Sequence, residues 1–79
     1  MRQNEKDVLV KMLDGDRLYK YTGAYPWKVS FEKSEEKVPA RTFDGLFKKA
    51  LIKVDDASAF ETWYKLTDIG HKLAAQIKI

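Results

Sequence analysis

Basic side chains gather in one short segment of this 79-residue chain, and such a segment could bind a polyanion. Residues 38–54, VPARTFDGLFKKALIKV, carry four basic and one acidic side chain, whereas the two kinds nearly balance on either side. The formal net charge of the chain is +3 at pH 7, so the excess positive charge lies almost wholly in this segment. A basic patch attracts nucleic acid, but patches of this size are also common on surfaces that bind nothing. Both interpretations stay open here.

The same segment has the apolar spacing of an amphipathic helix over residues 39–50. Pro39 suits the first helical turn, where the missing N–H of proline leaves no hydrogen bond unmade. Apolar residues then recur at positions i, i+3, i+4 and i+7 and would face a core: Phe43, Leu46, Phe47 and Ala50.

The opposite face of this predicted helix is basic. Its centre holds Arg41, Gly45 and Lys48, and its flanks hold Thr42, Lys49 and Asp44. A glycine inside a helix costs about 0.5–1 kcal/mol relative to alanine. Gly45 therefore indicates either that a phosphate strand or groove wall approaches the backbone closely, or that a surface glycine is tolerated.

A helix with a basic outer face fits the major groove of double-stranded DNA, where its cations displace condensed counterions. Arg41 is the best candidate for reading a base edge, and Lys48 and Lys49 would add attraction that does not depend on sequence. Two or three phosphate contacts from one small domain give weak binding. We therefore expect a working DNA-binding protein of this kind to be a dimer on two half-sites.

The elements before this helix are predicted to be a helix and a β-hairpin. Val8, Leu9, Met12 and Leu13 form one helical stripe over residues 5–14, which Asn4 would cap and Gly15 would end. Alternating residues then predict strands 17–22 and 27–32, joined by residues 23–26. The hairpin could add basic contacts to DNA: Arg17, Lys20 and Lys28.

The aromatic side chains of this hairpin have two interpretations. They could form a stacking platform for unpaired bases, or they could belong to the core: Tyr19, Tyr21, Tyr25 and Trp27. One face of a small hairpin must pack on the helices, which favours burial of Trp27, Val29 and Phe31.

After the basic helix, residues 52–54 and 62–66 read as two short strands, and Thr67 would cap a last helix. The predicted order is α-β-β-α-β-β-α, a single small α+β domain over residues 1–79. The last helix carries an apolar face that either closes the monomer core or forms a homodimer: Ile69, Leu73, Ile77 and Ile79.

The run VPARTFDGLFKKALIKV, followed by WYKLTDIGHKLA, resembles the second half of a winged helix-turn-helix domain of prokaryotic transcription regulators. The residues that carry the resemblance in the predicted recognition helix and the strand after it are Thr42, Phe43, Leu46, Ala50, Leu51 and Ile52; those at the end of the wing are Tyr64, Leu66, Thr67 and Gly70. The resemblance covers about half the chain. It implies DNA binding, with Thr42 at a phosphate. A hairpin replaces the helix that the family places before the recognition helix, so the domain would be a winged-helix variant.

The predicted wing is acidic and opens a second interpretation. Asp55, Asp56 and Glu61 surround its tip with no basic residue among them, so this wing would repel DNA. Trp63 and Tyr64 point to opposite faces of one strand, so one of them would be relatively exposed. The alternative function is therefore a protein-interaction module, an adaptor or inhibitor, that binds a protein partner through this wing.

Composition argues against several other classes. The chain has no cysteine, and its single histidine, His71, has no patterned carboxylate or metal-ligand spacing beside it, so we expect neither an enzyme nor a cofactor. Hydrophobic residues make up 44% and charged residues 34%. No apolar run approaches the roughly 18 residues of a spanning helix, and the start does not resemble a secretory signal. We therefore expect a cytoplasmic protein without a membrane partner.

Overall fold

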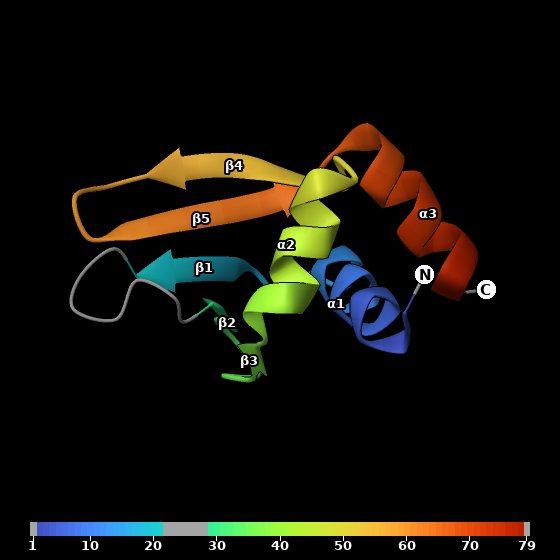
Figure 1. Ribbon diagram of the computed structural model, residues 1–79, viewed down its shortest axis with the longest axis horizontal. Coiled ribbons are helices and arrows are strands. Elements are labelled where there is room, and N and C mark those ends of the chain that lie inside the picture. Colours follow the sequence, from blue (N-terminus) through green and yellow to red (C-terminus); the bar gives the residue numbers. More distant parts are fainter. Residues whose placement is uncertain (1, 22–28, 79) are drawn as a thin grey trace.

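A computed structural model describes residues 2–21 and 29–78, which form three helices and an antiparallel sheet (Figure 1). The described elements are α1 (Gln3–Leu13), β1 (Leu18–Tyr21), β2 (Val29–Phe31), β3 (Lys37–Val38), α2 (Ala40–Lys48), β4 (Ile52–Ala57), β5 (Glu61–Leu66) and α3 (Asp68–Lys78). The α+β class is confirmed. The observed order differs from the predicted one by β3, a two-residue strand in the polar segment that was expected to lead directly into the second helix.

The strands form one sheet in the order β3-β2-β1-β5-β4, in which every pair is antiparallel. The predicted pairing of the first two strands is confirmed, with Leu18 opposite Phe31. β1 also pairs with β5, with Leu18 opposite Tyr64, so the two hairpins form a continuous sheet. The predicted connection between the hairpin strands, together with Tyr25, Trp27 and Lys28, lies outside the described residues.

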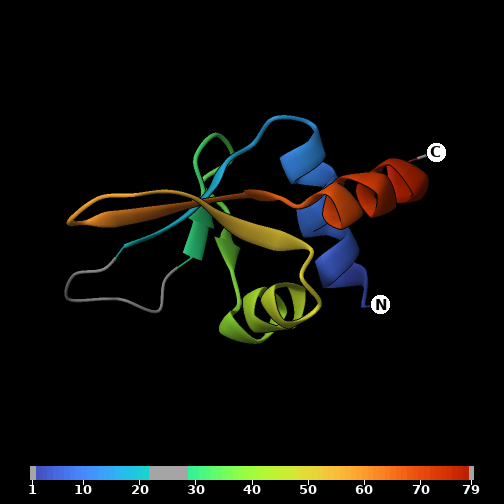
Figure 2. The same cartoon turned by 90° about the horizontal axis from the view of Figure 1, so that it is seen from above.

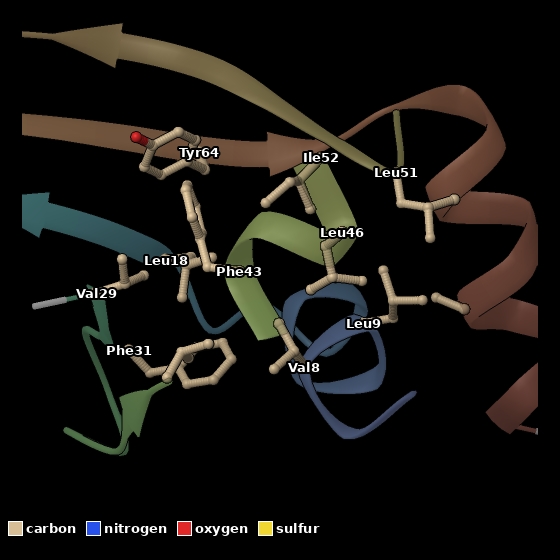
Figure 3. Packing of buried hydrophobic residues seen from close by; sticks show 12 residues of the cluster. Val8, Leu9, Leu18, Val29, Phe31, Phe43, Leu46, Leu51, Ile52 and Tyr64 are labelled. Carbon is tan, nitrogen blue, oxygen red and sulfur yellow. The ribbon is translucent and has the colours of Figure 1, made fainter. Parts of the chain in front are cut away.

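α2 covers one face of the sheet, and α1 and α3 pack against each other at one end of it (Figure 2). The core lies where these elements meet (Figure 3). Its buried apolar residues are Val8, Leu9, Leu18, Val29, Phe31, Val38, Phe43, Leu46, Leu51, Ile52, Tyr64 and Ala74. The aromatic side chains interlock across the layers, since the ring of Phe43 on α2 lies edge-on to that of Tyr64 with centroids 4.9 Å apart.

Two predicted core positions on α2 are wrong. Phe47 is 48% exposed, and its ring lies beside those of Phe43 and Tyr64, with centroids 5.9 and 6.4 Å away. Ala50 is exposed because the helix ends at Lys48 and Ala50 takes the left-handed conformation, with φ of 59°.

Of the two predicted ends of α1, only the C-terminal one agrees with the structure. Gly15, with φ of 100°, ends the helix as predicted, and the backbone N–H groups of Gly15 and Asp16 bond the carbonyl oxygens of Met12 and Lys11. The predicted cap at Asn4 is wrong, because Arg2 is the N-cap residue. Its backbone N–H donates to the Glu5 carboxylate at 3.2 Å.

The apolar face of α3 belongs mainly to the monomer. Leu73 and Ile77 are partly buried against the core, while Ile69 is 63% exposed. Ile79 lies outside the described residues. The core interpretation of this face therefore accounts for two of the three described positions. None of the helices in residues 2–21 and 29–78 is long and apolar enough to span a membrane.

Candidate nucleic-acid interface

Arg41 and Lys48 form the outer face of α2. Both side chains are exposed, and neither makes an ion pair with another residue that the structure describes. Asp44 is exposed on the same helix. Because an unpaired cation does not have to break an internal contact first, Arg41 and Lys48 are available to an external anion.

Gly45 is close to another part of the same chain. A Cβ atom at this position would lie 2.6 Å from Oε2 of Glu5, which reaches across from α1. The close approach that the sequence indicated at Gly45 is therefore made by the carboxylate of Glu5. A larger side chain at this position would displace that carboxylate.

Lys49 belongs to the same contact. Its Nζ atom donates to both carboxylate oxygens of Glu5 at 3.1 Å, while half of its own side chain remains exposed. Glu5 is only 3% exposed. Burial raises the pKa of the Glu5 carboxyl, but the hydrogen bonds from Lys49 and from the backbone N–H of Arg2 outweigh burial and hold that pKa below its ordinary value. Glu5 is therefore ionised at neutral pH and neutralises one of the predicted DNA-binding lysines.

Thr42 does not lie on an exposed flank as predicted, because it is only 7% exposed. The sequence could not reveal that α1 packs against this side of α2. Thr42 lines a hollow of about 230 Å³ whose other lining residues are Arg2, Glu5, Arg41, Gly45 and Lys49. We call Arg2, Arg41, Lys48 and Lys49 the α2 basic surface.

Arg2 and Glu5 were missed from the sequence as parts of this surface. Both lie in the first turn of α1, far from α2 along the chain, and only the packing of the two helices brings them to the hollow. An acidic residue three positions after an N-cap is a recognisable signal for helix capping. That signal locates Glu5 at a helix start but does not place it under Gly45.

The basic residues of the first hairpin do not all join this surface. Arg17 lies over the ring of Trp63, 4.4 Å from the ring centroid, and pairs with Asp55 at 3.6 Å. Lys20 is half-buried and lies opposite Val29 and Thr62 on the sheet face that α2 covers. Lys28 lies outside the described residues, so only Lys20 of the three shares a sheet face with α2 in the described structure.

Basic side chains neutralise part of the negative charge on the β4–β5 hairpin. The register shift between Val54 and Asp56 makes Asp55 the extra residue of a β-bulge. Asp55 contacts Lys65 at 3.4 Å in addition to Arg17. Asp56 is exposed and Glu61 is half-buried, and neither makes an ion pair with a described residue.

The aromatic positions of this hairpin differ from expectation. Tyr64 is 7% exposed and packs against Phe43, so it is unavailable to a protein partner. Trp63 is half-buried, with Arg17 on its ring and Tyr19 beside it at 4.9 Å between centroids. The exposed aromatic side chain is instead Phe60 at the turn, 74% exposed, which the sequence interpretation missed.

The described residues hold no group of three or more His, Cys, Asp or Glu side chains that could bind a metal ion. Comparison with protein families, with curated proteins and with solved structures finds no significant match to this chain. The two candidate binding surfaces of the described chain are the α2 basic surface and the tip of the β4–β5 hairpin, residues 55–61.

Proposed function

We propose that this protein binds double-stranded DNA through the α2 basic surface. The observation that carries the proposal is the pair Arg41 and Lys48, exposed on one face of one helix without an ion-pair partner in the described structure. Arg2 adds a positive charge at the hollow, where Glu5 pairs with Lys49. A helix with this charge can lie in the major groove while its cations contact phosphates, and Arg41 can reach a base edge.

The order of the elements supports a winged-helix variant. α2 is followed by the β4–β5 hairpin, which takes the place of a wing, and β1 pairs with that hairpin at β5. The segment between α1 and α2 contains strands in place of the helix expected in that family. In this proposal α2 supplies the DNA contacts, and the acidic hairpin tip turns away from the duplex. A transcription regulator built this way would read two half-sites as a dimer.

The test is a charge reversal, Arg41→Glu with Lys48→Glu, assayed by fluorescence anisotropy of a labelled random duplex at about 50 mM salt. The matched control is Lys33→Glu with Lys72→Glu, which changes the net charge equally at exposed positions away from α2. We expect the first variant to lose binding and the control to keep most of it. Equal loss in both variants would indicate attraction to the net charge and would reject α2 as the binding surface.

One observation favours a second candidate function, a protein-interaction module. Phe60 projects at the hairpin turn beside Asp56 and Glu61, so a partner would need an apolar pocket with a basic rim. Phe60→Ser would abolish binding to such a partner, whereas Arg41→Glu with Lys48→Glu would preserve it. The reverse pattern would reject this candidate.

A further inference from the structure

The Glu5–Lys49 pair places a negative charge inside the α2 basic surface. The carboxylate is almost fully buried, and both of its oxygens accept a hydrogen bond from Lys49. Gly45 makes this position possible, since a Cβ atom there would lie 2.6 Å from the carboxylate. An unfavourable mid-helix glycine is thus used to seat an anion beneath a basic helix face.

The surroundings of this carboxylate suit a second anion. Arg2, Arg41 and Lys49 line the same hollow. Thr42 also lines it, is only 7% exposed, and its hydroxyl makes no hydrogen bond within the part of the chain that the structure describes. Cations together with a free hydroxyl donor are the groups that bind a phosphate.

We propose that Glu5 competes with a DNA phosphate for Lys49 and thereby limits the affinity of the α2 basic surface for DNA. This inference rests on the proposed function. In the free protein Lys49 is held by Glu5. When a duplex lies on α2, Lys49 turns its ammonium group from Glu5 to a phosphate at the hollow. Half of the Lys49 side chain is exposed, so its ammonium group can turn outward without a movement of the backbone, although the two hydrogen bonds to Glu5 must break.

Glu5→Gln tests this competition, because glutamine keeps the shape of the side chain and removes its charge. The variant should bind a random duplex roughly three- to tenfold more tightly at about 50 mM salt, because Lys49 becomes free. The slope of log K against log salt should steepen by about 0.9, the value for one additional phosphate contact. An unchanged affinity and slope would overturn the proposal.

A double-mutant cycle separates Lys49 from general electrostatics. Adding Lys49→Gln to Glu5→Gln should remove the whole gain in affinity. The matched control is Asp44→Asn, which removes one exposed negative charge from α2. Its gain in affinity should survive in the Lys49→Gln background. If the gain of Glu5→Gln also survives there, the effect does not pass through Lys49 and the proposal is wrong.

A measurement on the unmodified protein covers the case in which Glu5→Gln does not fold. The ¹⁵N resonance of the Lys49 ammonium group, followed by NMR, should move when duplex DNA is added. An unmoved Lys49 resonance in a saturated complex would overturn the competition and leave the DNA-binding proposal standing. Absence of duplex binding by both the unmodified protein and a folded Glu5→Gln variant would reject the DNA-binding proposal itself.

Discussion

Among single residues, Gly70 is the described position that tolerates a side chain least. A Cβ atom there would lie 2.0 Å from the carbonyl oxygen of Leu51, a backbone atom that cannot move independently. Thr67 fixes the same contact, since its hydroxyl donates to the carbonyl of Ala50 at 2.6 Å and accepts from the N–H of Gly70 at 3.0 Å. The first turn of α3 is therefore held directly against the turn after α2.

Gly70→Ala should lower the free energy of unfolding by about 2–3 kcal/mol or more, because helix and turn must separate to admit the methyl group. Chemical denaturation measures this change. Lys72→Ala, at an exposed position of the same helix, should stay within about 0.5 kcal/mol of the unmodified protein. A Gly70→Ala variant as stable as Lys72→Ala would contradict the close contact.

The lowered pKa of the Glu5 carboxyl makes the free energy of unfolding depend on pH. Its pKa is lower in the folded protein than the ordinary value of 4.5, so its stabilising effect is fully present above that value. It is lost as the pH falls through the folded pKa. Unfolding measured between pH 6 and pH 3 should therefore show the stability advantage over Glu5→Gln shrinking toward the acidic end. An advantage that stays constant over this range would mean that the pair with Lys49 does not form.

The sequence predicted several of these residue roles and missed others. Thr67 could be marked as a helix start, because a cap depends on residues two or three positions away, whereas Gly70 was singled out only by the resemblance to winged-helix domains. Gly45 could be marked as a point of close approach, but the sequence suggested a phosphate strand or groove wall there and not the carboxylate of Glu5. Glu5 lies 40 positions earlier in the chain, and only the contact between α1 and α2 brings the two together.

At the scale of elements, α2 ends with a residue poorly suited to its conformation. Ala50 has φ of 59°, and the N–H groups of Ala50 and Leu51 bond the carbonyl oxygens of Phe47 and Leu46. This arrangement usually uses glycine, because a Cβ atom is strained in the left-handed region. The strain was invisible in the sequence, where Ala50 fits the apolar spacing of a longer helix.

Ala50→Gly should raise the free energy of unfolding by about 0.5–1 kcal/mol, because relief of this strain exceeds the added entropy of the unfolded chain. Thermal or denaturant unfolding tests it. The control is Lys72→Gly in the interior of α3, which should lower the free energy of unfolding by about 1 kcal/mol. Destabilisation by both glycines would show that the left-handed turn is absent.

Element types and the pairing within a hairpin were predictable from local sequence, whereas pairing between distant strands was not. The spacing of apolar residues indicates all three helices and the alternating strands. β3 has only two residues, too few for any period to appear. The pairing of β1 with β5 joins residues at least 40 positions apart, and nothing local specifies it.

At the scale of the whole molecule, the α2 basic surface and the tip of the β4–β5 hairpin lie apart along the longest dimension (Figure 1). The α2 basic surface lies beside the helical end, and the hairpin tip carries Asp56, Glu61 and the exposed Phe60 (Figure 1). The sequence indicated both regions as candidate binding surfaces, and both stay predictions. It could not predict that Arg17 would help Lys65 to neutralise Asp55, because Arg17 precedes β1 and β5 lies between β1 and β4 in the sheet.

The central claim is that duplex DNA contacts α2, and amide NMR of the ¹⁵N-labelled protein titrated with a short duplex tests it most directly. We expect the largest chemical-shift changes at residues 41–49 and at Arg2, decreasing as salt is raised from about 50 to 200 mM. The hairpin tip around Phe60 should remain unperturbed. An unchanged spectrum at the lower salt, or changes confined to residues 55–61, would contradict the claim.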